Sequence, residues 1–329
     1  MNDAGLTVTE RPSGHAATRG SATGALIRGA VSIAVLAFVA SRIDLAHVGT
    51  ALATLEWPWV AGAVGAVYAA ILVSAIKWGV LLHSRKRSLP LSRLVRHYLT
   101  GLYLNNFLPT SVGGDVVRAY DAGKDLDDTS EGAASVVAER LIASVGLALT
   151  AALGLAFVRV EPQVYIAVAV VFVAGIGLAG LFLLPSLSER IVRASVGGRS
   201  EGVVGWVGRT TAVTGELLRD LPTVGAVIVL SVVFQALVAA VNWFLFRALG
   251  AEVTFVQCVI CTSIVSAVTM VPISISGHGV REAGYAYFFG LVGAGAAVAV
   301  TASVLFFVTV AVCTLPGAAL FAAGRRRRA

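Results

Sequence analysis

Long apolar runs, separated by short polar stretches, follow one another along most of the chain. Each run is close to the ~20 residues that a helix needs to cross the hydrocarbon core of a bilayer. The pattern predicts about six membrane-spanning helices, at residues 25–43, 58–82, 132–158, 163–184, 223–247 and 296–322. The first run also has features of a signal peptide, but no clear cleavage triplet follows it, so we expect a retained helix.

Two further apolar segments break off abruptly. Residues 97–110 break at Pro109 in "LPTSVGGDVVRAY", and residues 255–271 break at Pro272 in "VPISISGHGVREAGY". In both cases Gly and Ser follow the proline, and a short helix-like stretch comes next. We therefore predict two re-entrant or broken helices, each of which returns to the side from which it entered.

The two broken segments are alike at a fixed offset. Shifted by 163 residues, Pro109 falls on Pro272, Ser111 on Ser274, Gly114 on Gly277, Val117 on Val280 and Arg118 on Arg281. Inverted repeats with Gly/Pro-interrupted segments in corresponding places point to the binding site of a transporter. We expect a membrane domain over residues 25–322, built from two inverted halves at about 25–160 and 163–322.

The distribution of charge gives these helices a direction. Apolar residues make up 57% of the chain and charged residues 13%, against about 25% charged residues in a soluble domain. The net charge of +7 comes from short basic clusters between apolar runs, which orient a membrane protein and do not indicate nucleic acid. We expect a multi-pass membrane protein with both termini in the cytoplasm. Residues 1–24 would form a disordered tail and residues 323–329 a basic tail.

Each break combines the features of an anion site. Non-helical backbone at membrane depth leaves N–H groups that need a partner, and the following helix points the positive end of its dipole at the break. Arg118 or Arg281 lies in or near the first turn of that helix. These features predict two facing half-sites for a lipid phosphate. In the alternative interpretation Arg118 pairs with Asp115 or Asp121, Arg281 pairs with Glu282 or another acid, and the breaks are only structural.

Other charges also fall inside apolar runs. In "VVAERLIASV", Glu139 shares a helix face with the small residues Ser135 and Ala143, so we expect this face to point inward. Glu139 either neutralises Arg118 or Arg281, or pairs elsewhere together with Arg140. We interpret Lys77, in "SAIKWGV", as a packing or snorkelling lysine rather than a ligand. The loop at 185–222 is either an amphipathic helix on the membrane surface or a solvated connector.

The stretches "NNFLPTSVGGDVVRAY", "AASVVAERLIASVGL" and "PISISGHGVREAGY" resemble the flippase-like membrane family related to the transmembrane part of lysylphosphatidylglycerol synthase. The resemblance implies a multi-helix inner-membrane fold that moves lipids with charged headgroups between leaflets. The matching candidates are Asn105, Asn106, Pro109, Gly113, Gly114, Asp115, Arg118, Glu139, Arg140, Pro272, Ser274, Gly277, Gly279, Arg281 and Glu282. The residues themselves add Ser111, Ser276 and His278 as groups that line the site.

We expect a lipid translocator without catalytic activity or cofactor. The bifunctional synthases carry an aminoacyl-transferase domain after the membrane part, whereas this chain ends in "AAGRRRRA", so we expect it not to load an amino acid onto lipid. The expected partner is a membrane phospholipid or a polyprenyl-linked lipid, and no phosphate-binding loop for ATP is found. The alternatives are an enzyme that acts on a lipid headgroup through His278 and Glu282, and a scaffold for a glycosyltransferase or lipid synthase.

Overall fold

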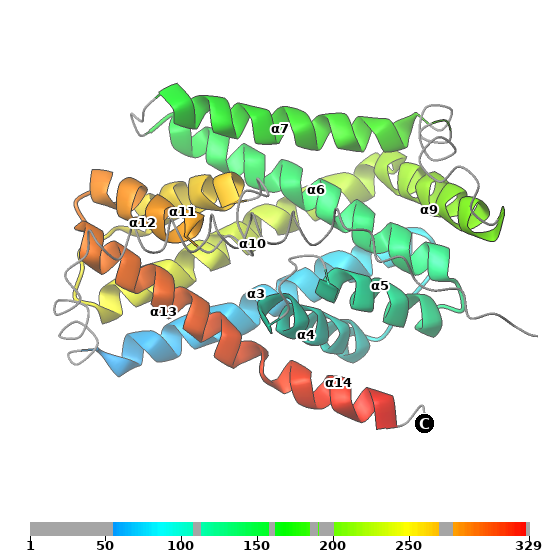
Figure 1. The fold of residues 1–329 in the computed structure, drawn as a ribbon, viewed down its shortest axis with the longest axis horizontal. Helices are drawn as coiled ribbons and strands as arrows, with labels where there is room; N and C mark the ends of the chain where they lie inside the picture. Colours follow the sequence, from blue (N-terminus) through cyan, green and yellow to red (C-terminus); the bar gives the residue numbers. More distant parts are fainter. Residues whose placement is uncertain are drawn as a thin grey trace, which may run out of the picture.

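The computed structural model describes residues 55–107, 113–157, 162–184, 190, 201–269 and 279–326. Every regular element in those ranges is an α-helix, as Figure 1 shows. The helices are α3 (Trp57–Ser84), α4 (Leu91–Phe107), α5 (Gly113–Asp125), α6 (Thr129–Leu155), α7 (Pro162–Leu183), α9 (Glu201–Arg219), α10 (Leu221–Ala248), α11 (Phe255–Thr269), α12 (Val280–Leu291), α13 (Ala296–Thr314) and α14 (Pro316–Arg326). The all-α polytopic fold predicted from the sequence is confirmed.

Four stretches of helix are long and apolar enough to cross a membrane, among the residues that the structure describes. They are α3, α6, α10 and the continuous stretch Ala296–Ala323. The last of these bends between α13 and α14, because Pro316 lacks the N–H that would continue the helix. The predicted span at 163–184 is the 22-residue helix α7. The predicted first helix at 25–43, the tail at 1–24 and the end of the basic tail lie outside the described residues.

Helices α3 and α10 each begin after a polar residue that is followed two positions later by proline. Glu56 precedes α3 and accepts a hydrogen bond from the indole of Trp59 at 3.1 Å. Asp220 precedes α10 and accepts from the backbone N–H of Thr223. Both helices carry a proline in their first two positions, where the missing N–H costs no hydrogen bond. The two longest described helices therefore start with the same local chemistry.

The order of helices repeats along the chain. A long helix, two short helices and another long helix occur as α3, α4, α5 and α6, and again as α10, α11, α12 and α13. The two leading helices are antiparallel, since the N–H of Glu56 donates to the carbonyl of Ala248 at 3.0 Å and Trp59 packs on Trp243. Figure 1 shows α3 and α10 crossing the bundle in opposite directions. This is the relation that inverted halves require, while their boundaries near residues 25, 160 and 322 stay a prediction.

The short helices of the first group form a hairpin. Asp125, at the end of α5, accepts from His97 at 3.0 Å and lies 3.9 Å from Arg93, near the start of α4. At the other end of the hairpin, the N–H of Gly114 donates to the side chain of Asn105 at 2.8 Å. With 17 and 13 residues, neither helix reaches the ~20 needed to cross a bilayer. The chain therefore enters and leaves this hairpin at the same end of the bundle.

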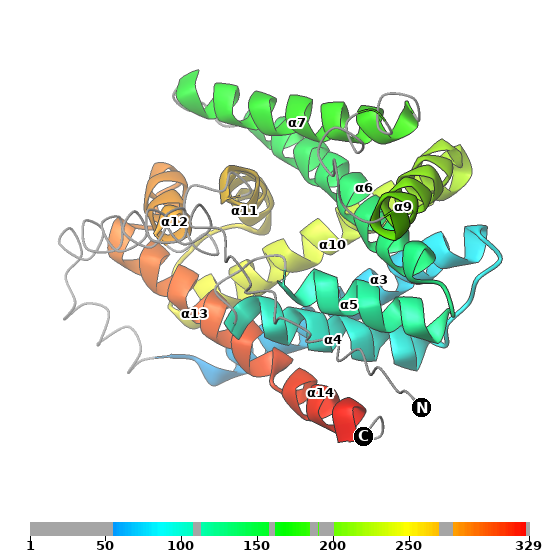
Figure 2. The same cartoon turned by 45° about the vertical axis from the view of Figure 1, so that its right-hand side comes forward.

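The second hairpin, α11 with α12, lies at the opposite end of the bundle (Figures 1 and 2). The thiol of Cys261 is 3.5 Å from the carbonyl oxygen of Phe288, and Phe289 packs on Phe246 of α10 with ring centroids 4.5 Å apart. Both hairpins have the geometry predicted for re-entrant elements. The breaks themselves, residues 108–112 and 270–278, lie outside the described residues, and with them Pro109, Ser111, Pro272, Ser274, Ser276, Gly277 and His278.

Candidate functional site

A buried carboxylate gathers three partners near the centre of the bundle. Glu139 of α6 lies 3.1 Å from the ammonium of Lys77 and 2.5 Å from the guanidinium of Arg118. The hydroxyl of Tyr98 donates to the same carboxylate at 2.6 Å. These groups come from α3, α5 and α4, and the side chains of the three charged residues are only 2–3% exposed. The cluster therefore joins four helices of the first half through one carboxylate.

Arg118 is held by aromatic rings as well as by charge. Its guanidinium carbon lies 4.8 Å from the ring of Trp78 and 4.5 Å from that of Tyr98, which is within the range of cation–π attraction. The indole of Trp78 in turn donates to Ser135 at 3.0 Å. Arg118 lies in the second turn of α5, and its Nε is buried without a hydrogen-bond partner among the described residues. The expected inward face of α6 is thus confirmed by Ser135 and Glu139, both 1% exposed.

The structure decides between the pairings left open by the sequence. Glu139 pairs with Arg118, whereas Arg140 pairs with Asp115 at 2.8 Å, so Asp115 is not the partner of Arg118. The structure contradicts a snorkelling Lys77, because its ammonium is buried against Glu139 and does not reach the aqueous interface, whereas a packing role agrees with its place in a buried ion pair. A lysine buried in a span needs a counter-charge, and Glu139 supplies it.

The start of α5 packs closely against α4. Asp115 lies in its first turn, where a carboxylate suits the positive end of the helix dipole. A Cβ on Gly114 would collide with the carbonyl oxygen of Gly101 and with the amide of Asn105. Asn106 donates to Thr314 at the end of α13 at 3.1 Å. Gly114 and Asn105 therefore close the hairpin, and Asn106 attaches it to the second half, while Gly113 is the first residue of α5.

The corresponding charges of the second half are arranged differently. Arg281, in the first turn of α12, lies 2.7 Å from its neighbour Glu282 and donates through Nε to Ser303 at 3.2 Å. Glu282 also accepts from the N–H of Gly279 at 2.6 Å and so caps the helix. The pairing of Arg281 with Glu282 is the one that the structural interpretation anticipated. Arg281 and Arg118 thus rely on different carboxylates.

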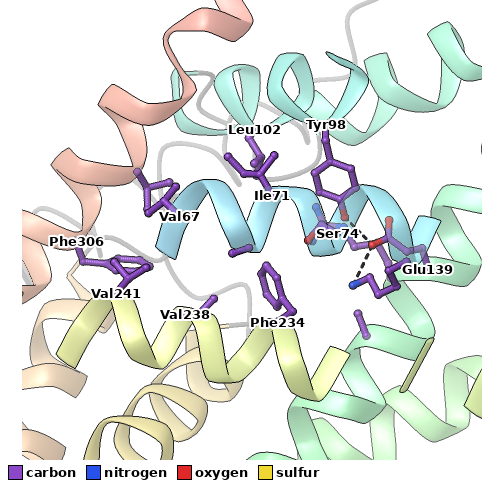
Figure 3. Close-up of a pocket in the computed structure, with 15 residues that line it drawn as sticks. Val67, Ile71, Ser74, Tyr98, Leu102, Glu139, Phe234, Val238, Val241 and Phe306 are labelled. Atoms are coloured by element: carbon purple, nitrogen blue, oxygen red, sulfur yellow. Dashed lines mark hydrogen bonds and ion pairs between the residues drawn. The ribbon is translucent and has the colours of Figure 1, made fainter. Parts of the chain in front are cut away.

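A cavity of about 190 Å³ adjoins the Glu139 cluster. Figure 3 shows Ser74, Tyr98 and Glu139 on one side of it and the apolar side chains of Val67, Val241 and Phe306 on the other. The wall is completed by residues of α3, α4, α6, α10 and α13, among them Lys77, Arg140, Ala143, Phe234 and Val310. The cavity therefore offers a charged end and an apolar end, as an amphiphilic ligand requires.

Sequence reasoning missed three of the residues that shape this cavity: Lys77, Tyr98 and Phe234. The ammonium of Lys77 lies 5.4 Å from the ring centroid of Phe234. Lys77 carried a signal, since a lysine within an apolar span is a functional candidate by default. Tyr98 and Phe234 carried none, because only their position in the folded bundle distinguishes them from other aromatic residues.

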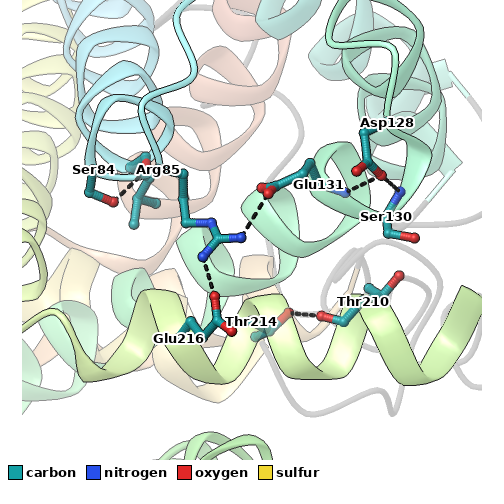
Figure 4. A network of polar contacts seen from close by, with 9 residues as sticks. Ser84, Arg85, Asp128, Ser130, Glu131, Thr210, Thr214 and Glu216 are labelled. Carbon is teal, nitrogen blue, oxygen red and sulfur yellow. Dashed lines mark hydrogen bonds and ion pairs between the residues drawn. The ribbon is translucent and has the colours of Figure 1, made fainter.

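A second polar network ties three helices together where α3 ends. Arg85 lies 2.8 Å from Glu131 of α6 and also contacts Glu216 of α9, as Figure 4 shows. Asp128 caps α6 by accepting from the N–H groups of Ser130 and Glu131. Of the two interpretations left open for residues 185–222, α9 supports the helix over residues 201–219, and its place on the membrane surface stays a prediction.

The described residues contain no group of three or more His, Cys, Asp or Glu side chains that could hold a metal ion. Comparison with known families gives a match over most of the chain. A family model described as "Lysylphosphatidylglycerol synthase TM region" matches residues 25–317. No curated protein matches the chain.

Proposed function

This chain belongs to the family of the lysylphosphatidylglycerol synthase transmembrane region, and from that premise we propose that it moves a phosphate-bearing lipid between the two leaflets of a membrane. The family comprises membrane domains linked to lipid synthesis or translocation. The cargo class is a phospholipid, an aminoacylated lipid or a polyprenyl-phosphate-linked intermediate. The protein acts as a translocator and not as an enzyme.

The observation that carries this proposal is a buried charge cluster that opens onto a largely apolar cavity inside the bundle. Lys77 and Glu139 border a cavity whose far wall is formed by Val67 and Phe306. A lipid presents the same combination, because it has a charged headgroup joined to an apolar chain. The antiparallel leading helices and the two hairpins at opposite ends support alternating access to such a site from either leaflet.

The direction of the chain in the membrane follows from its basic residues. Arg85, Lys86, Arg87, Arg93 and Arg96 lie at the end of α3 and the start of α4, while Arg247 lies at the end of α10. The positive-inside rule puts the first group in the cytoplasm. With the predicted first helix retained, both termini then lie in the cytoplasm of an inner-membrane protein.

Purified full-length chain in liposomes with labelled lipids tests the proposal. Exchange of a labelled phospholipid between leaflets, with the lipid chemically unchanged and above the rate in protein-free liposomes, is the expected result. Appearance of a new lipid species would instead identify an enzyme. If neither exchange nor conversion is found for any of the three lipid classes, the translocator proposal fails and a scaffold role replaces it.

His278 offers a sharper test of the enzymatic alternative, although it lies outside the described residues. Under the translocator proposal it only lines the site, so His278→Gln retains part of the exchange activity. An enzyme that used His278 and Glu282 as acid and base would lose conversion while it kept lipid binding. Glu282 already caps α12 and pairs with Arg281, which supports a structural role for this carboxylate.

A further inference from the structure

Among the residues that the structure describes, the cluster around Glu139 contains more positive than negative charge. Lys77 and Arg118 share one carboxylate, while the charge of Arg140 is balanced by Asp115 at 2.8 Å. Lys77 and Arg118 are nearly inaccessible, with side chains 3% and 2% exposed. Burying an uncompensated charge is unfavourable, so a cation in excess at a cavity indicates that an anion binds there.

Both oxygen atoms of Glu139 are already engaged. Oε1 receives the hydroxyl of Tyr98 at 2.6 Å and lies 3.1 Å from the ammonium of Lys77, and Oε2 lies 2.5 Å from Arg118. A positively charged headgroup would have to displace one of these partners and would meet the excess positive charge. An ammonium has three donors, so Lys77 can bind Glu139 and a phosphate oxygen in the cavity at the same time.

We propose that this cavity takes the phosphate of an anionic lipid and disfavours a headgroup with a net positive charge. The proposal rests on the proposed function and adds the charge class of the cargo. Lys77 and Arg140, the two cations in the cavity wall, face the phosphate, and the apolar wall receives the adjoining part of the lipid. A volume of about 190 Å³ slightly exceeds that of an engineered protein cavity, about 150 Å³, that binds benzene. It suits a headgroup or one chain segment, so the remaining lipid lies outside it.

The test is a binding competition on the purified full-length chain in zwitterionic phosphatidylcholine nanodiscs. A fluorescent phosphatidylglycerol is displaced by unlabelled phosphatidylglycerol, by an aminoacylated phosphatidylglycerol of net positive charge, or by inorganic phosphate. We expect the anionic lipid to compete best and the cationic lipid worst, with a difference on the order of tenfold or more, as ~1.4 kcal/mol produces. Equal or better competition by the cationic lipid would overturn the proposal. If inorganic phosphate displaced the fluorescent lipid at the same concentration as unlabelled lipid, the cavity would bind free phosphate. That result would overturn the proposal that the bound phosphate belongs to a lipid.

Two variants test whether this cavity is the origin of the preference for the anionic lipid. Lys77→Gln removes the excess charge, so we expect the preference for the anionic over the cationic lipid to fall on the order of tenfold. Lys124→Gln makes the same change at an exposed residue of α5 and serves as the matched control, with the preference unchanged. If the preference survives Lys77→Gln intact, the cavity is not its origin.

The wild-type competition needs no variant, so the proposal can be decided even if Lys77→Gln fails to fold. Lys77→Arg, which keeps the charge, should retain most of the preference for the anionic lipid. The same nanodisc experiment also separates this proposal from the proposed function. If the protein prefers the anionic lipid but exchanges no lipid between leaflets in liposomes, the proposed translocation is refuted and the proposed charge class stands. If it exchanges a cationic lipid and shows no preference for the anionic lipid, only the proposed charge class is refuted.

Discussion

The two halves of the protein share an architecture and differ in their charges. In the first half, Arg118 reaches across to a carboxylate on another helix and lies between two aromatic rings. In the second, Arg281 pairs with the adjacent residue Glu282 on its own helix. At the 163-residue offset that relates the two breaks, Lys77, Tyr98 and Glu139 correspond to Ala240, Cys261 and Ala302. The buried charge cluster therefore belongs to the first half alone.

The two halves have their helix arrangement in common but not their buried ion pairs. The helix order, the short hairpins and the starts of α3 and α10 are common to both halves, because they depend on apolar length, proline and caps. The ionic cluster depends on three side chains and can therefore be absent from one half without loss of the fold. The protein thus has a nearly symmetric arrangement of helices around an asymmetric charge cluster, so its two halves should respond differently to equivalent mutations.

The largest expected effect is a change in the side of the membrane from which a cysteine is labelled, and it tests whether the two halves are inverted. Ser88 follows α3, and its equivalent at the 163-residue offset is Ala251, beside the exposed residue Glu252 after α10. Single cysteines at Ser88 and Glu252, in a background without Cys258, Cys261 and Cys313, should react with a membrane-impermeant maleimide from opposite sides, Ser88 from the cytoplasm. Labelling of both from the same side would disprove the inverted relation of the halves.

The next effect is the loss of the shared carboxylate. Glu139→Gln leaves Lys77 and Arg118 buried without a counter-charge, and breaking a buried pair in this way costs about 3–5 kcal/mol. Glu282→Gln should cost clearly less, because Arg281 keeps its hydrogen bond to Ser303 and is 16% exposed. Thermal unfolding of the purified variants in the same detergent measures both. Equal losses of stability would mean that the two halves carry equivalent ion pairs after all.

A smaller effect distinguishes the two hairpins. Gly114→Ala introduces a Cβ that collides with the backbone of Gly101, and such overpacking costs about 1–3 kcal/mol. In the second hairpin, a Cβ at Gly284 would lie 3.2 Å from a methyl group of Val265, a side chain that can shift. Gly284→Ala should therefore be close to neutral, since alanine also favours the helix by about 1 kcal/mol. A stability loss for Gly284→Ala as large as for Gly114→Ala would contradict the closer backbone packing of the first hairpin.

Much of the architecture was readable from the sequence because it depends on local patterns. Apolar length predicted the spans of α3, α6 and α10 to within a few residues, and proline with glycine predicted the two hairpins. The break between α13 and α14 was missed, since Pro316 lies within a run that is otherwise uniformly apolar. Length and composition show where a helix can span, and proline alone does not say whether the helix bends or ends.

The site was predictable only in part, because its contacts join residues far apart in the chain. The sequence identified Arg118 and Glu139 as intramembrane charges but left their pairing open, since Tyr98 and Arg118 reach Glu139 from other helices. The partner of Lys77 was missed for the same reason, because it lies on α6, 62 positions further along the chain. The residues of the breaks, including Ser111, Ser276 and His278, remain predicted ligands.

The smallest expected effect separates the two arginines by their aromatic surroundings. A lysine at either position keeps the charge but loses the planar guanidinium, which stacks on rings and donates in a fixed fork. Arg118 has two rings within 4.8 Å of its guanidinium carbon, whereas Arg281 has Phe307 at 5.3 Å. Cation–π contacts contribute about 0.5–1 kcal/mol at exposed sites and about 2 kcal/mol or more when they are desolvated, and a lysine retains part of this attraction. Arg118→Lys should therefore lower the stability by roughly 1–2 kcal/mol, and Arg281→Lys by less than about 1 kcal/mol.

Urea or thermal titrations followed by tryptophan fluorescence suit this comparison, because Trp78 contacts Arg118 directly. Arg118→Lys should also change the emission of the folded protein, while Arg281→Lys should leave it as in the wild type. Phe307→Leu removes the ring beside Arg281 and is the matched control for the second half. If Arg281→Lys proves as costly as Arg118→Lys, the aromatic cage of the first half contributes nothing specific, and the asymmetry between the halves rests on the carboxylate of Glu139 alone.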